Sequence, residues 1–212
     1  TLFAINPVES GFAKSLARPG GNVTGVLFAD PEFSAKSVQL LKETVPTMRR
    51  FGYLYPAGLA GVQPFIEAMA AAALALGLAF YRYPIARSEE MAMVLDAMKK
   101  DGIDALRVNY VGPVQAGTAQ LLEFAASNRI ATLFSVATPV ERGGLMSYAP
   151  KLSDSAGRGA AFVDRLLKRA LPAEMPFEYP TRYDLVVNLK TAKQAGITVP
   201  QSVLLRADRV IE

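Results

Sequence analysis

The 212-residue sequence contains no histidine, no cysteine and no tryptophan. Without cysteine and histidine the chain has no thiol nucleophile and no Cys/His zinc site, and it cannot form a Ser-His-Asp triad. An enzyme built from this sequence would have to work with carboxylates, lysine, tyrosine or serine alone.

The common enzyme motifs are missing as well. The sequence has no GxxxxGK[ST] loop, no GxGxxG after a strand and no GxSxG elbow. The acidic pair Glu89-Glu90 stands at the start of a predicted helix, where it complements the helix dipole. We therefore expect no catalytic residue, no metal site and no cofactor.

Charge and hydropathy narrow the class of protein further. Hydrophobic residues make up 51% of the chain and charged residues 20%, which is typical of a globular fold. The net charge is +4, but the basic residues are scattered and no stripe interleaves them with aromatics, so we expect no nucleic-acid partner. The longest apolar run, residues 68–80, is too short to span a bilayer, and the opening "TLFAINP" is typical of a strand and its turn.

From Phe51 onward, short apolar runs alternate with longer segments of helical pattern. The runs predict five strands, at residues 51–55, 78–84, 104–110, 130–136 and 145–149. Helices are predicted at residues 63–77, 88–102 and 115–129. This alternation predicts an α/β fold with a doubly wound parallel sheet in the strand order 2-1-3-4-5.

The two ends of the chain add smaller elements. The first 46 residues predict strands at 1–6 and 22–28 and helices at 8–18 and 34–46. The tail predicts a helix at 153–170, a strand at 182–188, a helix at 189–196 and a final helical turn. A glycine-rich turn, "RPGGN", follows the first predicted helix and precedes the next predicted strand. Such a turn can bind a phosphate, or it can simply connect the two elements.

Ligands of open parallel sheets bind beyond the carboxyl ends of the strands. Those ends carry tyrosine, asparagine and serine, which offer flat apolar faces together with orientable hydrogen-bonding groups. Such a set suits a small, partly apolar ligand, although a tyrosine at a strand end can equally cover only a sheet edge. The candidate binding residues are Asn6, Tyr55, Asn109, Tyr110, Ser135, Ser147 and Tyr148.

Several long stretches resemble one protein family. They are "NPVESGFAKSLARPGGNVTGV", "SAKSVQLLKETVP", the segment from "GGLMSYAPKLSDS" to "KQAGITVP", and the closing "LLRADRVIE". The sequence resembles, nearly end to end, the ABC-transporter substrate-binding proteins of the tryptophan/tyrosine-uptake-like group, which have the type I periplasmic binding protein fold. The resemblance implies two lobes joined by a hinge, a small molecule held in the cleft between them and no catalysis. It also implies export to the periplasm or the extracellular side and delivery of the ligand to a membrane permease, and it makes "RPGGN" a structural turn.

The resemblance also implies how the chain is divided. Residues 1–46 would be a partial lobe one and residues 47–149 lobe two, while residues 150–212 would hold a helix crossing back to lobe one, then the last strand and helices of lobe two. We expect a C-terminal portion without the signal sequence or most of lobe one, able to self-associate through residues 1–46.

The ligand is left open between several small molecules. Where amino-acid-binding members of the group have Pro-x-Asp-Asn, this sequence has "NYVGPVQ", so an aromatic acid, an aromatic amino acid and a small amide all fit. The alternative functions are the ligand-sensing effector domain of a transcription regulator, which shares the fold, and an α/β enzyme that depends on carboxylates.

Overall fold

The structure is a computed structural model that describes all residues from Thr1 to Glu212. The chain forms two compact units, each assembled from separate stretches of sequence. Unit 1 comprises residues 1–33, 60–67 and 150–183, and unit 2 comprises residues 34–59, 68–149 and 184–212.

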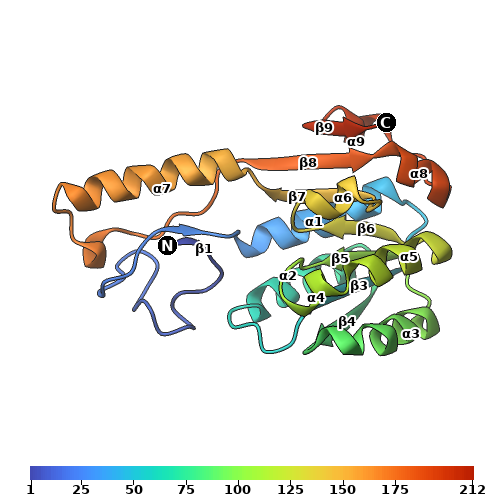
Figure 1. Cartoon of the computed structure of the whole chain (residues 1–212), viewed down its shortest axis with the longest axis horizontal. Helices are drawn as coiled ribbons and strands as arrows, with labels where there is room; N and C mark the ends of the chain where they lie inside the picture. Colours follow the sequence, from blue (N-terminus) through green and yellow to red (C-terminus); the bar gives the residue numbers. More distant parts are fainter. The chain divides into compact units, whose positions relative to one another are not determined.

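A seven-stranded sheet is the framework of unit 2 (Figure 1). Its strands are β3 (Arg50–Pro56), β4 (Ala79–Ile85), β5 (Ala105–Val108), β6 (Ala131–Phe134), β7 (Met146–Pro150), β8 (Tyr183–Asn188) and β9 (Arg209–Ile211). They lie in the order β4-β3-β5-β6-β7-β8-β9. The first five strands pair in parallel, so the predicted fold class and the predicted order 2-1-3-4-5 are confirmed.

The last two strands run against the first five. The Asn188 N–H donates to the Leu145 carbonyl, and the Lys151 N–H donates to the Arg182 carbonyl, so the partners run in opposite directions. β9 then pairs in parallel with β8. The prediction of a closing helical turn was incomplete, because a short helix is followed by β9. This edge strand of three residues is largely exposed and is held by its pairing with β8. The local sequence pattern does not indicate this pairing, so the strand could not be predicted from it.

Helices connect the strands and cover both faces of this sheet. Their bounds are α1 (Pro31–Thr44), α2 (Gln63–Ala75), α3 (Met91–Asp101), α4 (Pro113–Ala116), α5 (Thr118–Asn128), α6 (Thr138–Glu141), α8 (Leu189–Ala195) and α9 (Gln201–Leu204), with a 3-10 turn η1 (Ser88–Glu90) before α3. The single helix predicted at 115–129 is instead divided between α4 and α5 at Gly117. Gly117 lies so close to α3 that an added Cβ would stand 2.5 Å from the Met91 Cε.

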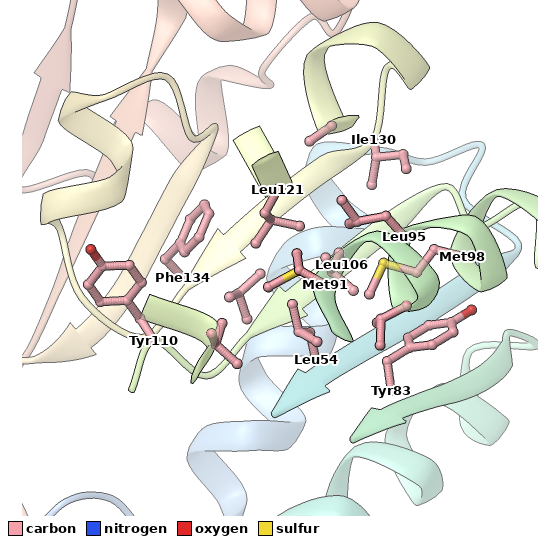
Figure 2. Packing of buried hydrophobic residues seen from close by; sticks show 14 of the residues in the cluster. Leu54, Tyr83, Met91, Leu95, Met98, Leu106, Tyr110, Leu121, Ile130 and Phe134 are labelled. Atoms are coloured by element: carbon pink, nitrogen blue, oxygen red, sulfur yellow. The ribbon is translucent and has the colours of Figure 1, made fainter. Parts of the chain in front are cut away.

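One face of the sheet packs against α3 and α5. Figure 2 shows Leu54 and Leu106 of the strands lying beside Met91, Leu95 and Met98 of α3, all of them buried. Leu121 of α5 and Phe134 of β6 extend the same cluster. Burial of large apolar side chains drives the docking of these helices.

The opposite face carries the alternate residues of each strand. In β3 these are Phe51, Tyr53 and Tyr55. α1 lies on this face, where the Thr44 hydroxyl contacts the Met146 sulfur at 3.6 Å. A right-handed crossover from β3 to β4 places α2 on the same face, because β4 and β5 lie on opposite sides of β3.

Unit 1 contains a parallel pair, β1 (Leu2–Ala4) and β2 (Val26–Leu27), together with α7 (Leu152–Leu167) and a 3-10 turn η2 (Pro172–Glu174). Its core joins Val26 to Phe162 of α7 and to Met175. Of the strand predicted at 22–28, only the two residues of β2 form a strand in the structure.

The helix predicted at 8–18 is wrong, because turns occupy this stretch. The Pro7 carbonyl accepts hydrogen bonds from the N–H groups of Phe12 and Ala13, Gly11 has a positive φ of 75°, and the Ser15 hydroxyl bonds to Arg18. Glycine and serine that bond locally to the backbone compete with a helix.

In the glycine-rich turn, one amide is bonded within the chain, which favours the structural interpretation of this turn. Gly20 has φ 69°, and its N–H donates to the Ala173 carbonyl at 3.0 Å. That amide is therefore committed to the chain itself and does not cradle an anion.

None of the helices, the 16-residue α7 included, combines the length and the apolar character that a transmembrane span requires.

Gly52 in the middle of β3 gives a test of this packing. A Cβ at this position would lie 2.9 Å from the Tyr83 ring and 3.0 Å from Leu106. We expect Gly52→Ala to lower the free energy of unfolding by about 1–3 kcal/mol, measured by urea denaturation. Gly157→Ala is the control, because a Cβ there meets nothing within 4 Å and alanine favours the helix. Equal effects of the two substitutions would contradict the packing described for β3.

Candidate functional site

Four of the sequence-predicted residues share the carboxyl edge of the sheet in unit 2. Leu54 pairs with Val108, Val108 with Phe134, and Phe134 with Ser147. The next residue on each of these strands therefore lies at one level and on one face. These next residues are Tyr55, Asn109, Ser135 and Tyr148.

Two tyrosines of β3 stack on each other at this edge, where Tyr53 is 4% and Tyr55 9% exposed. The rings of Tyr53 and Tyr55 stack with their centroids 4.8 Å apart and an interplanar angle of 16°. The Asn109 Nδ2 donates to the Tyr53 hydroxyl at 3.2 Å. Burial raises the pKa of Tyr53, so its phenol remains neutral and can both donate and accept.

Arg107 places a positive charge beside these rings. It lies opposite Tyr53 in the register of β5 and is only 5% exposed. Its Nη1 donates to the carbonyls of Val108 at 3.1 Å and Leu133 at 3.3 Å. Burial lowers the pKa of Arg107 to about 10, so the guanidinium is still charged at neutral pH.

The sequence prediction missed Arg107 and Tyr53 because it considered only the residues at the strand ends. The signal for Arg107 was present: a charged residue stands in the middle of the apolar strand "ALRV". Long charged side chains are seldom buried in a strand without a partner or a purpose.

Tyr110 and Ser147 lie on the other face of the sheet. The Tyr110 ring packs edge-on against Phe134, with centroids 6.3 Å apart, inside the cluster that α3 and α5 cover (Figure 2). Its N–H donates to the Ser135 hydroxyl at 2.9 Å. Ser147 is 1% exposed, and its hydroxyl has no hydrogen-bond partner. The structure thus does not bring these two residues to the side that holds Tyr55 and Asn109.

Asn6 belongs to unit 1 and follows β1. Its Oδ1 accepts from the Glu9 N–H, and its Nδ2 donates to the Glu9 carboxylate, both at 3.2 Å. Gly61 lies directly behind it, since an added Cβ there would be 2.3 Å from the Asn6 Cβ. These contacts fix the orientation of the Asn6 side chain within the turn from Asn6 to Glu9.

The carboxyl edge of unit 2 therefore combines a pair of stacked aromatic rings, an amide, a hydroxyl and one guanidinium. No group of three or more His, Cys, Asp or Glu residues gathers anywhere in the structure. The edge can stack against a flat apolar body and donate hydrogen bonds to polar atoms, which is binding chemistry.

A family model described as ABC transporter substrate binding protein matches residues 2–211. The chain belongs to this family. It is a solute-binding protein of an ABC transporter, which agrees with the resemblance found in the sequence. No curated protein matches the chain.

Solved structures show the same fold. An ABC domain from Streptococcus pneumoniae in complex with L-Trp is 28% identical, with a TM-score of 0.89 over 99% of this chain and 70% of that one. A conserved domain protein from Vibrio cholerae is 24% identical, with a TM-score of 0.88 over the same shares. A ligand-free, open substrate-binding protein with adhesive properties from Clostridium difficile is 22% identical, with a TM-score of 0.74 over 99% of this chain and 69% of that one.

These likenesses confirm the type I periplasmic binding protein fold. A LacI-family repressor from Corynebacterium glutamicum shares it at 16% identity over 69% of this chain and 59% of its own, with a TM-score of 0.51. The transcription-regulator alternative is therefore the weaker one.

The buried tyrosines give a test of the electrostatics of unit 2. Burial raises the pKa of Tyr53, and burial together with the hydrogen bond to Asp101 at 2.8 Å raises that of Tyr83. In urea all eight tyrosines should ionise at about pH 10. In the folded chain Tyr53 and Tyr83 should still be protonated at this pH. Their stabilising contribution is complete below about pH 10 and is lost as the pH rises further.

Absorbance at 295 nm against pH measures this difference. We expect Tyr53→Phe to leave the amplitude of the folded chain at about pH 10.5 unchanged and to lower that of the unfolded chain by one tyrosine. A smaller amplitude in the folded variant would show that Tyr53 ionises freely.

Proposed function

We propose that this protein captures a small aromatic amino acid or a related aromatic acid and delivers it to the permease of an ABC transporter. The observation that carries the proposal is the Tyr53–Tyr55 stack at the carboxyl edge of unit 2, with Arg107 and Asn109 beside it. The Streptococcus pneumoniae structure in complex with L-Trp supports this ligand class.

Each side chain has a distinct part in this proposal. The tyrosine rings stack against the flat body of the ligand, and Asn109, Ser135 and Tyr148 orient its polar groups. The charge of Arg107 favours a ligand with a carboxylate, because a buried charge acts through a low dielectric. Tyr110 and Ser147 would act indirectly, by holding the strands that carry the other residues.

The lobe assignment supplies the second half of the site. Lobe one would include residues 1–46 and the returning helix α7, lobe two residues 47–149 with the last strands, and Asn6 would contribute from lobe one. Ligand affinity would come from closure of the lobes and exclusion of water. The protein would act without catalysis, outside the cytoplasmic membrane. The exposed side chains of Leu2, Val8 and Phe12 support the expectation of self-association through residues 1–46.

Thermal unfolding in the presence of candidate ligands tests the proposed ligand class. A ligand bound only by the folded chain raises the midpoint, with about 2.7 kcal/mol of stabilisation at a hundredfold excess over Kd. We expect L-tryptophan or L-tyrosine to raise the midpoint, L-tryptophan amide to raise it less, and glucose to leave it unchanged. A shift with glucose alone, or with none of these compounds, would exclude the proposal.

Arg107→Met separates the role of the charge from that of the rings. We expect this variant to remain folded, because an apolar side chain of similar length can replace a buried charge. It should bind L-tryptophan and L-tryptophan amide equally weakly. A preference for the acid that survives the substitution would remove Arg107 from the site.

Tyr148→Ala tests the aromatic side chain that β7 brings to this edge. We expect binding of L-tryptophan to weaken by about 1–3 kcal/mol in calorimetry, since a lost ring removes contact area. Tyr179→Ala is the matched control, because Tyr179 is an exposed residue of unit 1. Unchanged affinity in Tyr148→Ala would show that this ring lies outside the site.

A further inference from the structure

A pocket of about 500 Å³ lies at the other edge of the unit 2 sheet, where β3, β5 and β6 begin. Four connecting loops form it, namely those from α1 to β3, from α3 to β5, from α5 to β6 and from α8 to α9. Its lining includes Ile103, Asp104, Asn128, Arg129 and Ile197. Because the strands are parallel, this edge is opposite to the one that carries Tyr55 and Asn109.

Three helices end at this pocket. Thr44 is the last residue of α1, Asn128 of α5 and Ala195 of α8. The last carbonyls of a helix lack partners within the helix and carry a partial negative charge. At the end of α1 this charge is already met by Lys42, whose Nζ donates to the carbonyls of Pro46 at 2.7 Å and Met48 at 2.8 Å. The ends of α5 and α8 are therefore the ones that suit a further positively charged group.

Asp104 adds a fixed carboxylate to the same pocket. Its Oδ2 accepts hydrogen bonds from the N–H groups of Arg49 at 2.7 Å and Arg50 at 2.8 Å, which leaves Oδ1 uncommitted. Asn128 uses its Nδ2 on the Phe124 carbonyl and leaves its own Oδ1 as an acceptor. Both uncommitted oxygens can accept hydrogen bonds from an ammonium group.

Arg129 supplies the opposite charge. It ends α5 in the left-handed region with φ 55°, where α3 and α8 have Gly102 (φ 61°) and Gly196 (φ 71°). A residue with a side chain is disfavoured in this conformation, so the arginine is kept at a cost in stability. Its side chain is exposed, and no hydrogen bond or ion pair holds the guanidinium.

We propose that this pocket is a second binding site, for a small zwitterion with an aliphatic body. The ammonium group would face Asp104 and the carboxyl ends of α5 and α8, and the carboxylate would face Arg129. The aliphatic body would pack on Ile103 and Ile197. The proposal is independent of the ligand proposed for the carboxyl edge, because the two sites share no residue.

Titration of the isotope-labelled chain with L-valine, followed by amide NMR, tests the pocket. We expect saturable shifts of the amides of Asp104, Arg129 and Gly196. Isovalerate lacks the ammonium group and isobutylamine lacks the carboxylate, so each should bind at least roughly tenfold more weakly. Equal binding of the three compounds, or shifts confined to Tyr55, Asn109 and Tyr148, would overturn the proposal.

Arg129→Gly removes the guanidinium and suits the backbone conformation, so the variant should fold. We expect its affinity for L-valine to fall roughly tenfold or more. Arg169→Gly is the matched control, because Arg169 also has a positive φ, of 68°, but lies in unit 1. Unchanged affinity in Arg129→Gly, or an equal loss in the two variants, would overturn the proposal irrespective of how L-tryptophan binds.

Discussion

The pairing of β3 with both β4 and β5 is the constraint on which the rest of unit 2 depends. β3 is hydrogen-bonded on both sides in parallel register, and the Asp104 carboxylate fixes its first amides. This register sends Leu54 into the core under α3 and sends Tyr53 and Tyr55 to the other face. A shift of one residue would exchange the two sets, so core and site cannot be changed independently.

The sheet of unit 2 was predictable because its strands and helices alternate with clear periodicity and punctuation. The errors arose where local patterns do not decide the structure. Residues 8–18 have the composition of a weak helix, yet backbone bonds to Pro7 and a positive φ at Gly11 form turns. The predicted helix divides at Gly117, which lies close to Met91, and β9 is an edge strand paired with β8. Both depend on residues distant in sequence.

The candidate site was predictable in position and less so in detail. The rule for parallel sheets selects Tyr55, Asn109 and Tyr148 from their places at strand ends. It does not distinguish the two faces, so it also selected Tyr110 and Ser147. Each of these is the neighbour of another selected residue, Asn109 or Tyr148, and neighbours on a strand point to opposite faces. It omitted Arg107, which lies buried inside β5 and not at its end. Burial and reach are tertiary properties, and a single sequence reports them only through an out-of-place charge.

The antiparallel strand β8 has a consequence for synthesis of the chain. The chain leaves unit 2 after Ala149, forms a segment of unit 1, and returns to unit 2 at Asp184. The residues that complete the sheet of unit 2 are therefore translated after this segment of unit 1. Until β8 emerges from the ribosome, β7 is an open strand edge, and open edges pair readily with other chains. The nascent protein therefore passes through an aggregation-prone interval that ends only when residues 184–212 have been made. Slow late translation, or a bound chaperone, would have its greatest effect in that interval.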